Sequence, residues 1–140
     1  MEKTPFKVKI NLDSVKLPSK STEPFGNTVV RLKDPARIVE VTIGELVKAV
    51  SEGRAFTPGV MHGAGKADWK QQQLFVLDID NDVDTLPRLT PEGVYQTLEC
   101  AGFYVAFMYY SYSSTPEKLK FRVMLVCSEV VTDEKEHYAI

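Results

Sequence analysis

The sequence lacks the features that would mark a membrane or secreted protein. No apolar run approaches the roughly 20 residues that a membrane-spanning helix needs. The residues after Met1 lead into an alternating pattern and not into the apolar core of a signal peptide. Its two cysteines, Cys100 and Cys127, form neither a metal-type pair nor a disulfide framework. We therefore expect a cytoplasmic protein with no membrane partner.

An excess of positive charge is also absent. The chain carries 17 Lys and Arg against 19 Asp and Glu, which gives a net charge of -2. Proteins that hold nucleic acid mainly through phosphate contacts are usually basic overall. Any contact with nucleic acid is therefore expected to be weak, to use a local basic patch, or to depend on a larger parent protein.

A nucleotide-binding phosphate loop is missing as well. The run Gly63-Ala64-Gly65-Lys66 lacks the required glycine five residues before its Gly-Lys pair, and Ala67 occupies the place of a metal-binding Ser or Thr. What remains is the composition of a soluble globular protein, 44% apolar and 26% charged over 140 residues. We predict a single domain, residues 1–140, with an amino-terminal β/α extension at 1–65 and a second part at 66–140.

In the first half of the chain, the sequence predicts only a few helices and strands. Residues 6–12 alternate between apolar and polar side chains, which indicates a half-buried strand. A loop at 18–27 and a short strand at 28–32 follow. Thr42 is a predicted N-cap for a helix at 43–51, with Gly53 just beyond its end. Residues 57–73 are predicted to be irregular.

The second half predicts strand, helix, strand, strand and the start of a helix. The apolar run 74–79 is typical of a central strand covered on both faces or nearly so. A polar turn at 81–89 precedes a helix that begins at Thr90 and ends at Gly102, with Val94, Tyr95 and Leu98 as its buried stripe. Strands at 103–110 and 120–127 follow, and Thr132 opens the last helix.

This order matches the first two-thirds of a βαββαβ unit. We therefore predict an α+β fold of the RRM-like or ferredoxin-like type, known as a split βαβ, that is incomplete at its carboxyl end. The missing closing strand indicates either a fragment or an amino-terminal strand that takes the vacant place.

The pair Asp78 and Asp80 is the sharpest chemical feature. Residues two apart in a strand point to one face, so the carboxylates project together from backbone positions about 6–7 Å apart. Two carboxylates this close repel unless a cation neutralises them. Their hard oxygens suit Mg²⁺ or Mn²⁺, which also hold substrate phosphates. The competing interpretation is an acid-rich turn that ends the strand and continues through Asn81, Asp82 and Asp84.

A basic pair, Lys120 and Arg122, occupies one face at the start of the last predicted strand. Opposite the two carboxylates, such a pair would bind the phosphates of a nucleoside triphosphate, although a solvated strand edge explains it equally well. Ser113 and Ser114 are candidate phosphate donors or simply part of a polar hairpin. The tyrosines at 109, 110 and 112 would either stack on bases or pack in the core.

Two segments together resemble a known family. Residues 75–81 (FVLDIDN) and 110–123 (YSYSSTPEKLKFRV), followed by 130–134 (VVTDE), are similar to the primase-polymerase domain of phage and plasmid replication proteins. These domains belong to the archaeo-eukaryotic primase superfamily. The similarity covers about residues 66–140. A histidine that the superfamily usually carries near the following strand is absent, and Arg122 with Lys120 takes its place.

The resemblance implies a metal-dependent polymerase palm that takes part in the initiation of DNA replication. Asp78 and Asp80 would bind the metal, and Arg122 would act with them in catalysis. Lys120, Arg122, Ser113 and Ser114 would contact the triphosphate. A third metal-binding carboxylate would fall after Ile140. The implied partners are a nucleoside triphosphate, a DNA template and a helicase, either as a carboxy-terminal domain or as a separate protein.

Two other functions fit parts of the sequence. A palm without catalytic activity could serve as a DNA-binding or partner-binding module of a replication complex, which the acidic net charge favours. A phosphatase of the haloacid dehalogenase type is suggested by Asp78-Ile79-Asp80, but Asp82 stands where that family has Thr or Val, and its large doubly wound domain has little room here.

Overall fold

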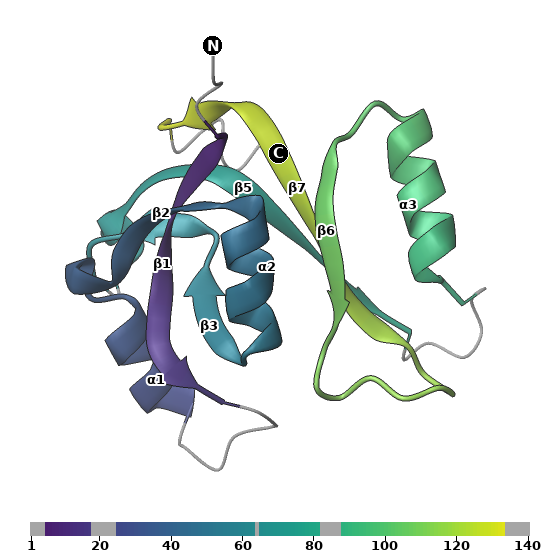
Figure 1. Cartoon of the computed structure of the whole chain (residues 1–140), viewed down its shortest axis with the longest axis horizontal. Helices are drawn as coiled ribbons and strands as arrows, with labels where there is room; N and C mark the ends of the chain where they lie inside the picture. The colour runs from purple at the N-terminus through teal and green to yellow at the C-terminus, as the bar shows by residue number, and fades with distance from the viewer. Residues whose placement is uncertain (1–4, 18–24, 64, 82–87, 134–140) are drawn as a thin grey trace. The chain divides into compact units, whose positions relative to one another are not determined.

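A computed structural model describes residues 5–17, 25–63, 65–81 and 88–133. The chain forms two compact units, one made of residues 1–74 with 128–140 and the other of residues 75–127. The boundary falls within two long strands. The protein is of the mixed α+β class with antiparallel sheets, as the sequence predicts (Figure 1).

The described residues form twelve secondary-structure elements. The strands are β1 (Lys7–Lys16), β2 (Ile38–Thr42), β3 (Arg54–Thr57), β4 (Gly59–Met61), β5 (Trp69–Asp80), β6 (Val105–Tyr110) and β7 (Lys120–Val131). The helices are α1 (Phe25–Leu32), α2 (Ile43–Ser51) and α3 (Pro91–Cys100), with short 3-10 turns at η1 (Pro35–Arg37) and η2 (Lys66–Asp68). Within these residues, no helix has the length and apolar character needed to cross a membrane.

The first sheet has the order β2-β1-β3, with both neighbours antiparallel to β1. The alternation expected for residues 6–12 is confirmed at 7–10, where Val8 and Ile10 are fully buried and Lys7 and Lys9 are exposed. It is wrong at Phe6, which is 51% exposed, and at Asn11, which is buried. Each fully buried aliphatic side chain of this kind contributes roughly 1.5–3 kcal/mol. The strand continues beyond the predicted end, to Lys16, through a change of register after Leu12.

Two buried polar side chains of β1 hold the surrounding segments. Asn11 donates to the carbonyl oxygens of Leu32 at 3.1 Å and Met61 at 2.9 Å, and it accepts a hydrogen bond from the Met61 N–H at 2.9 Å. Asp13, with no exposed side-chain area, accepts two hydrogen bonds from the Arg31 guanidinium at 2.8 and 2.7 Å. The buried groups are thus paired, as burial of polar atoms requires.

The prediction of a strand at 28–32 is wrong, because these residues belong to α1. Thr28 and Leu32, four positions apart, are the buried pair of one helical face. Val30 is 70% exposed. The β-branched residues favour a strand locally, but burial of that face and the Arg31–Asp13 ion pair favour the helix.

Helix α2 forms where the sequence predicts it. The Thr42 side chain accepts a hydrogen bond from the Glu45 N–H at 3.1 Å, and the Glu45 carboxylate accepts one from the Thr42 N–H at 3.2 Å. This reciprocal capping box satisfies two amide groups at the helix start. Gly53 follows the helix with a φ of 82°, in the region that glycine adopts without strain.

The second sheet has the order β4-β5-β7-β6. The expectation that residues 57–73 are irregular is wrong in two places, since β4 lies at Gly59–Met61 and β5 already begins at Trp69. Strand β4 pairs antiparallel with β5. Its partners lie at residues 69–72 of β5, upstream of the strand that the sequence predicts at 74–79.

Helix α3 and the strands of the 75–127 unit share a small core. Val94 of α3 packs with Phe121 and Val123 of β7, and Ile79 of β5 and Leu98 of α3 lie against them. The predicted helix start at Thr90 is confirmed by the hydrogen bond from the Gly93 N–H to the Thr90 hydroxyl at 3.1 Å. The predicted buried stripe is wrong at Tyr95, which is 45% exposed; Val94 is buried and Leu98 is half-buried.

The remaining predictions concern the chain after α3. Strands are confirmed at Val105–Tyr110 and Lys120–Val131, the latter extending four residues beyond the predicted end at 127. The helix expected to open at Thr132 lies, from residue 134 onward, outside the described residues, as do residues 82–87 of the predicted turn.

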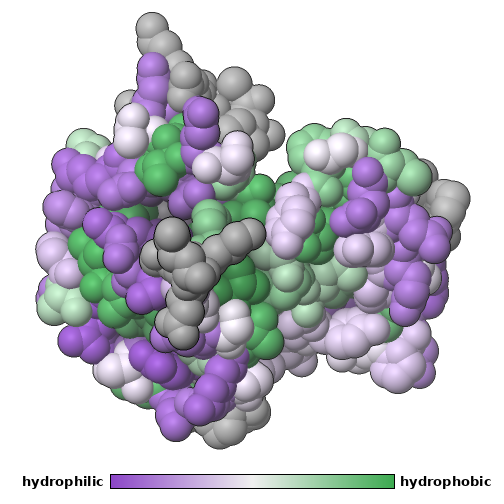
Figure 2. Space-filling model, turned by 45° about the horizontal axis from the view of Figure 1, so that its top comes forward, coloured by the Kyte–Doolittle hydropathy of each residue, from purple (hydrophilic) through white to green (hydrophobic). Residues whose placement is uncertain are grey.

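Hydrophilic and hydrophobic residues are interspersed over the face of the molecule that Figure 2 presents.

Candidate functional site

The end of β5 presents two carboxylates on the surface of the 75–127 unit. The side chains of Asp78 and Asp80 are 67% and 51% exposed. The run before them is not covered on both faces as predicted: Leu74 is fully buried, but Leu77 is 38% exposed. Ile79 packs against the α3 core, so its strand neighbours at 78 and 80 face away from that core. A carboxylate on an exposed strand face remains hydrated and accessible to ligands.

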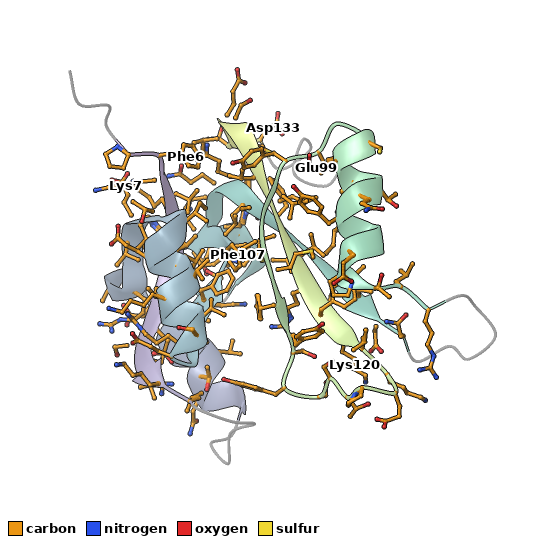
Figure 3. All side chains as sticks on the ribbon, turned by 45° about the vertical axis from the view of Figure 1, so that its right-hand side comes forward. Phe6, Lys7, Glu99, Phe107, Lys120 and Asp133 are labelled. Carbon is orange, nitrogen blue, oxygen red and sulfur yellow. The ribbon has the colours of Figure 1, made fainter. Side chains whose placement is uncertain are left out.

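The first residues of β7 bring two cations to these carboxylates. The Lys120 Nζ lies 3.6 Å from the Asp80 Oδ1, and the Arg122 Nε lies 3.8 Å from the Asp78 Oδ1. Residue numbers rise along one strand as they fall along the other, the pattern of antiparallel neighbours. Figure 3 shows Lys120 at the start of β7, beside the β6–β7 loop. The four charged residues that the sequence analysis identified thus lie together as two cross-strand pairs.

The two ion pairs are long, and their side chains are between 23% and 67% exposed. Surface pairs of this kind contribute little to stability, because solvent screens them and side-chain freedom is lost. Phe121 and Val123, the neighbours of Arg122, are buried, so the fold and not the pairing keeps the charged face in place. The carboxylates and cations are therefore free to exchange their partners for a ligand.

Tyr109 of β6 adds a contact that the sequence analysis did not identify. It stands opposite Arg122 in the β6–β7 register, and the Arg122 Nη1 donates to its hydroxyl oxygen at 3.4 Å. The guanidinium carbon also lies 6.0 Å from the centroid of the ring. The hydrogen bond to Tyr109 raises the pKa of Arg122, burial opposes this, and Asp78 adds to the increase. Arg122 is therefore a permanent cation.

The predicted phosphate donors Ser113 and Ser114 lie in the β6–β7 loop, where they stabilise the turn. The Ser114 hydroxyl oxygen accepts a hydrogen bond from the Lys120 N–H at 2.9 Å. Ser113 is exposed, with its hydroxyl 3.4 Å from that of Ser111. Ser111 donates its N–H to the Lys120 carbonyl at 2.9 Å. These contacts are those of the polar hairpin, the alternative that the sequence left open.

Asn81, directly after the carboxylates, fixes the end of β5. Its side-chain amide donates to the carbonyl oxygens of Leu119 at 2.7 Å and Leu89 at 3.0 Å. It also accepts a hydrogen bond from the Leu89 N–H at 2.8 Å. Sequence reasoning treated Asn81 only as a turn residue, and its contacts 8 and 38 positions away leave no local signal. Asn81 joins the two chain segments that flank the charged face.

The carboxylates of Asp78 and Asp80 supply part of the ligand set that a hard divalent cation needs. Two carboxylates on alternate strand positions supply oxygen ligands, and Mg²⁺ commonly completes its shell with water and substrate phosphates. Within the residues that the structure describes, no group of three or more His, Cys, Asp and Glu side chains comes together. Asp82 and Asp84 of the acidic run lie outside those residues.

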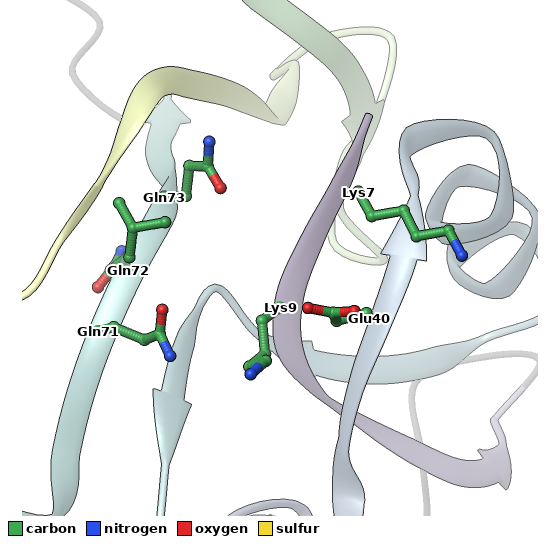
Figure 4. Close-up of a pocket in the computed structure, with 7 residues that line it drawn as sticks. Lys7, Lys9, Glu40, Gln71, Gln72 and Gln73 are labelled. Carbon is green, nitrogen blue, oxygen red and sulfur yellow. The ribbon is translucent and has the colours of Figure 1, made fainter. Parts of the chain in front are cut away.

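A separate cavity lies in the other unit. Its volume is about 140 Å³, and it is bordered by Lys7, Lys9, Glu40, Val130 and the glutamines at 71–73. In Figure 4 the glutamines project from β5, and Lys9 and Glu40 from β1 and β2. Amide and ammonium groups outnumber the single carboxylate, so this lining does not provide a divalent-metal site.

Comparison of the chain with protein-family models, with curated proteins and with solved structures found no match.

Proposed function

We propose that the 75–127 unit is part of a metal-dependent nucleotidyl-transfer palm that acts in the initiation of DNA replication. The observation that supports this most strongly is the pairing of two carboxylates on β5 with two cations on β7. Carboxylates that hold a divalent metal, beside cations that hold phosphate oxygens, are the combination that a metal-bound nucleoside triphosphate requires.

The order of the strands supports the same proposal. Strands β5 and β6 are joined by α3, and β7 lies between them in the sheet. This arrangement has the connectivity of a split βαβ unit. The α3 core occupies one face, so the charged residues at alternate positions lie on the other. An RRM-like palm, with helices on one side and the site on the open side, has this distribution.

The charged residues would have distinct roles in that reaction. Asp78 and Asp80 would hold Mg²⁺ or Mn²⁺. When bound, this metal would neutralise negative charge on the reacting oxygens. Their carboxylates would then release Lys120 and Arg122 to phosphate oxygens. Arg122 offers planar paired donors to phosphate, whereas the Lys120 ammonium acts as a point charge. The loop serines would keep Lys120 in register.

A second function has its own observation in favour. Each carboxylate already has a cation beside it, and the described residues provide no third acid at the site. Such a face suits a catalytically inactive module that binds single-stranded DNA or a protein partner. The phosphatase alternative gains no support, because both neighbours of β5 in the sheet are antiparallel rather than part of a doubly wound parallel sheet.

The test is a titration of Mn²⁺ followed by electron paramagnetic resonance, with and without a nucleoside triphosphate. The double variant Asp78→Asn, Asp80→Asn removes both charges but keeps the side-chain size. A matched control, Glu92→Gln with Glu129→Gln, makes the same charge change at exposed positions outside the site. Triphosphate-enhanced Mn²⁺ binding that only the Asp78/Asp80 variant loses supports the palm. Binding of single-stranded DNA without any Mn²⁺ or triphosphate binding supports the inactive module.

A further inference from the structure

The guanidinium of Arg122 is held from two directions. Its Nε faces the Asp78 carboxylate at 3.8 Å, and its Nη1 donates to the Tyr109 hydroxyl at 3.4 Å. Among the residues that the structure describes, Nη2 has no hydrogen-bond or ion-pair partner. Two sides of the planar group are therefore oriented by the protein, and the remaining N–H groups are left for a ligand.

The Tyr109 side chain is itself well placed to act as a support. Its backbone lies opposite Arg122 in the antiparallel register of β6 and β7. Its ring stacks on Phe107, two residues earlier in β6, with centroids 6.0 Å apart and planes inclined by 22°. The guanidinium carbon lies 6.0 Å from the same ring. Tyr109 therefore contacts Arg122 through both its hydroxyl group and its ring.

We propose that Tyr109 is a positioning residue for Arg122, which it orients towards the phosphates of a bound nucleoside triphosphate. This inference rests on the proposed function of the charged face. A long, flexible arginine loses side-chain freedom when it binds a ligand, and a residue that restrains it beforehand reduces that loss. Tyr109 acts through Arg122 and need not touch the substrate.

Tyr110 provides a natural comparison. It is adjacent in sequence, but it stands opposite Phe121 in the register and contacts that ring edge-on, with centroids 6.5 Å apart. Alternation along β6 thus places Tyr110 on the core side of the sheet and Tyr109 on the charged side. Both Tyr→Phe changes remove one hydroxyl group from a tyrosine of the same strand, but only the Tyr109 hydroxyl contacts Arg122.

The first experiment measures the dissociation constant of a Mn²⁺-bound nucleoside triphosphate by calorimetry. Tyr109→Phe keeps the ring and removes the hydrogen bond, so we expect binding to weaken roughly threefold to tenfold. Tyr110→Phe should leave binding unchanged. In an Arg122→Lys background, which lacks the planar guanidinium, Tyr109→Phe should have no further effect, because the two changes remove the same interaction.

A second measurement uses the ligand-free protein. The ¹H–¹⁵N signal of the Arg122 side chain reports how fast the guanidinium moves and exchanges with water. Tyr109→Phe should speed both, whereas Tyr110→Phe should not. An unchanged signal in the Tyr109 variant, or additive losses of affinity in the Arg122→Lys background, would overturn the positioning role.

The outcomes also separate the two proposals. Failure of the wild-type protein to bind the triphosphate overturns the proposed function, and this role for Tyr109 falls with it. Tight binding by the wild type that Tyr109→Phe leaves unaltered overturns the role of Tyr109 alone. Thermal unfolding of each variant is measured in parallel, because a loss of affinity without a change in stability assigns the effect to the site.

Discussion

Replacement of Arg31 by methionine removes one half of a buried ion pair and leaves the carboxylate of Asp13 without its cation. The Asp13 side chain is completely buried, and that of Arg31 is 30% exposed. Loss of one partner of a fully buried pair costs roughly 3–5 kcal/mol. Asp13 keeps a hydrogen bond from the Val15 N–H at 3.3 Å, and Arg31 reaches solvent. We therefore expect a loss of about 2–3 kcal/mol in unfolding free energy at neutral pH.

The dependence of this loss on pH gives a sharper test. Burial of Asp13 disfavours its charge, but the hydrogen bonds from Arg31 and Val15 and the attraction of Arg31 outweigh burial and lower its pKa. A lowered pKa in the folded state stabilises the wild type above the ordinary value of about 3.9, and this contribution disappears as the pH falls below it. In Arg31→Met, Asp13 loses the contribution of Arg31, and burial becomes the largest influence on its pKa. The pKa of Asp13 should therefore rise above its ordinary value. The difference between the two proteins should then shrink between neutral pH and about pH 4.

The assay is urea denaturation at several pH values, followed by the fluorescence of Trp69, the single tryptophan, which lies in the same unit as the ion pair. Arg37→Met, at a half-buried position outside the ion pair, is the control, and we expect a change within about 0.5 kcal/mol. The double variant Asp13→Asn, Arg31→Met should recover part of the loss, since no buried charge remains. A loss that stays constant with pH would refute the electrostatic explanation.

Three further predictions concern local structure. Gly53→Ala should destabilise the protein by more than Gly102→Ala does. Both positions have positive φ, at a cost of about 1–2 kcal/mol, but a Cβ at Gly53 would also overlap the backbone oxygen of Leu17. Urea denaturation of the two variants measures the difference. Asn81→Ala should cost about 2–3 kcal/mol through its three lost hydrogen bonds, also measured by urea denaturation. Thr42→Ala should cost about 1 kcal/mol and Thr42→Ser much less, as judged by thermal unfolding.

Local signals in the sequence were enough to predict several elements. Thr42 with Glu45, and Thr90 with Pro91, are start signals that depend only on neighbouring residues, and both helices form as predicted. The alternation that begins at Lys7 likewise needs only the local period of a strand. Where one short segment contains the physical cause, sequence alone identifies the structure.

Other elements depend on residues distant in the chain. Residues 28–32 have strand-like side chains, yet they form a helix whose Arg31 pairs with Asp13, 18 positions away. The start of β5 includes three glutamines, which carry no strand signal. Gln72 is nevertheless buried, where it accepts a hydrogen bond from the Trp69 indole at 3.0 Å and donates one to the Leu74 carbonyl at 2.8 Å.

At the candidate site, too, some features follow from local sequence and others depend on residues distant in the chain. Spacing two apart placed each charged pair on one face, and the structure brings the pairs together. The contact between Tyr109 and Arg122 depends on the register of the β6–β7 hairpin, which the sequence does not specify. The link from Asn81 to Leu119 spans 38 positions and is likewise set by the fold.

Paramagnetic broadening by Mn²⁺ tests most directly whether a divalent metal binds at Asp78 and Asp80. Trace Mn²⁺ is added to ¹⁵N-labelled protein with a nucleoside triphosphate, and the backbone amide signals are compared with a Mg²⁺ reference. We expect selective broadening at residues 78–80 and 120–122, which Asp78→Asn with Asp80→Asn abolishes. Broadening centred elsewhere, or none at Mn²⁺ and triphosphate concentrations that load such sites, would contradict it.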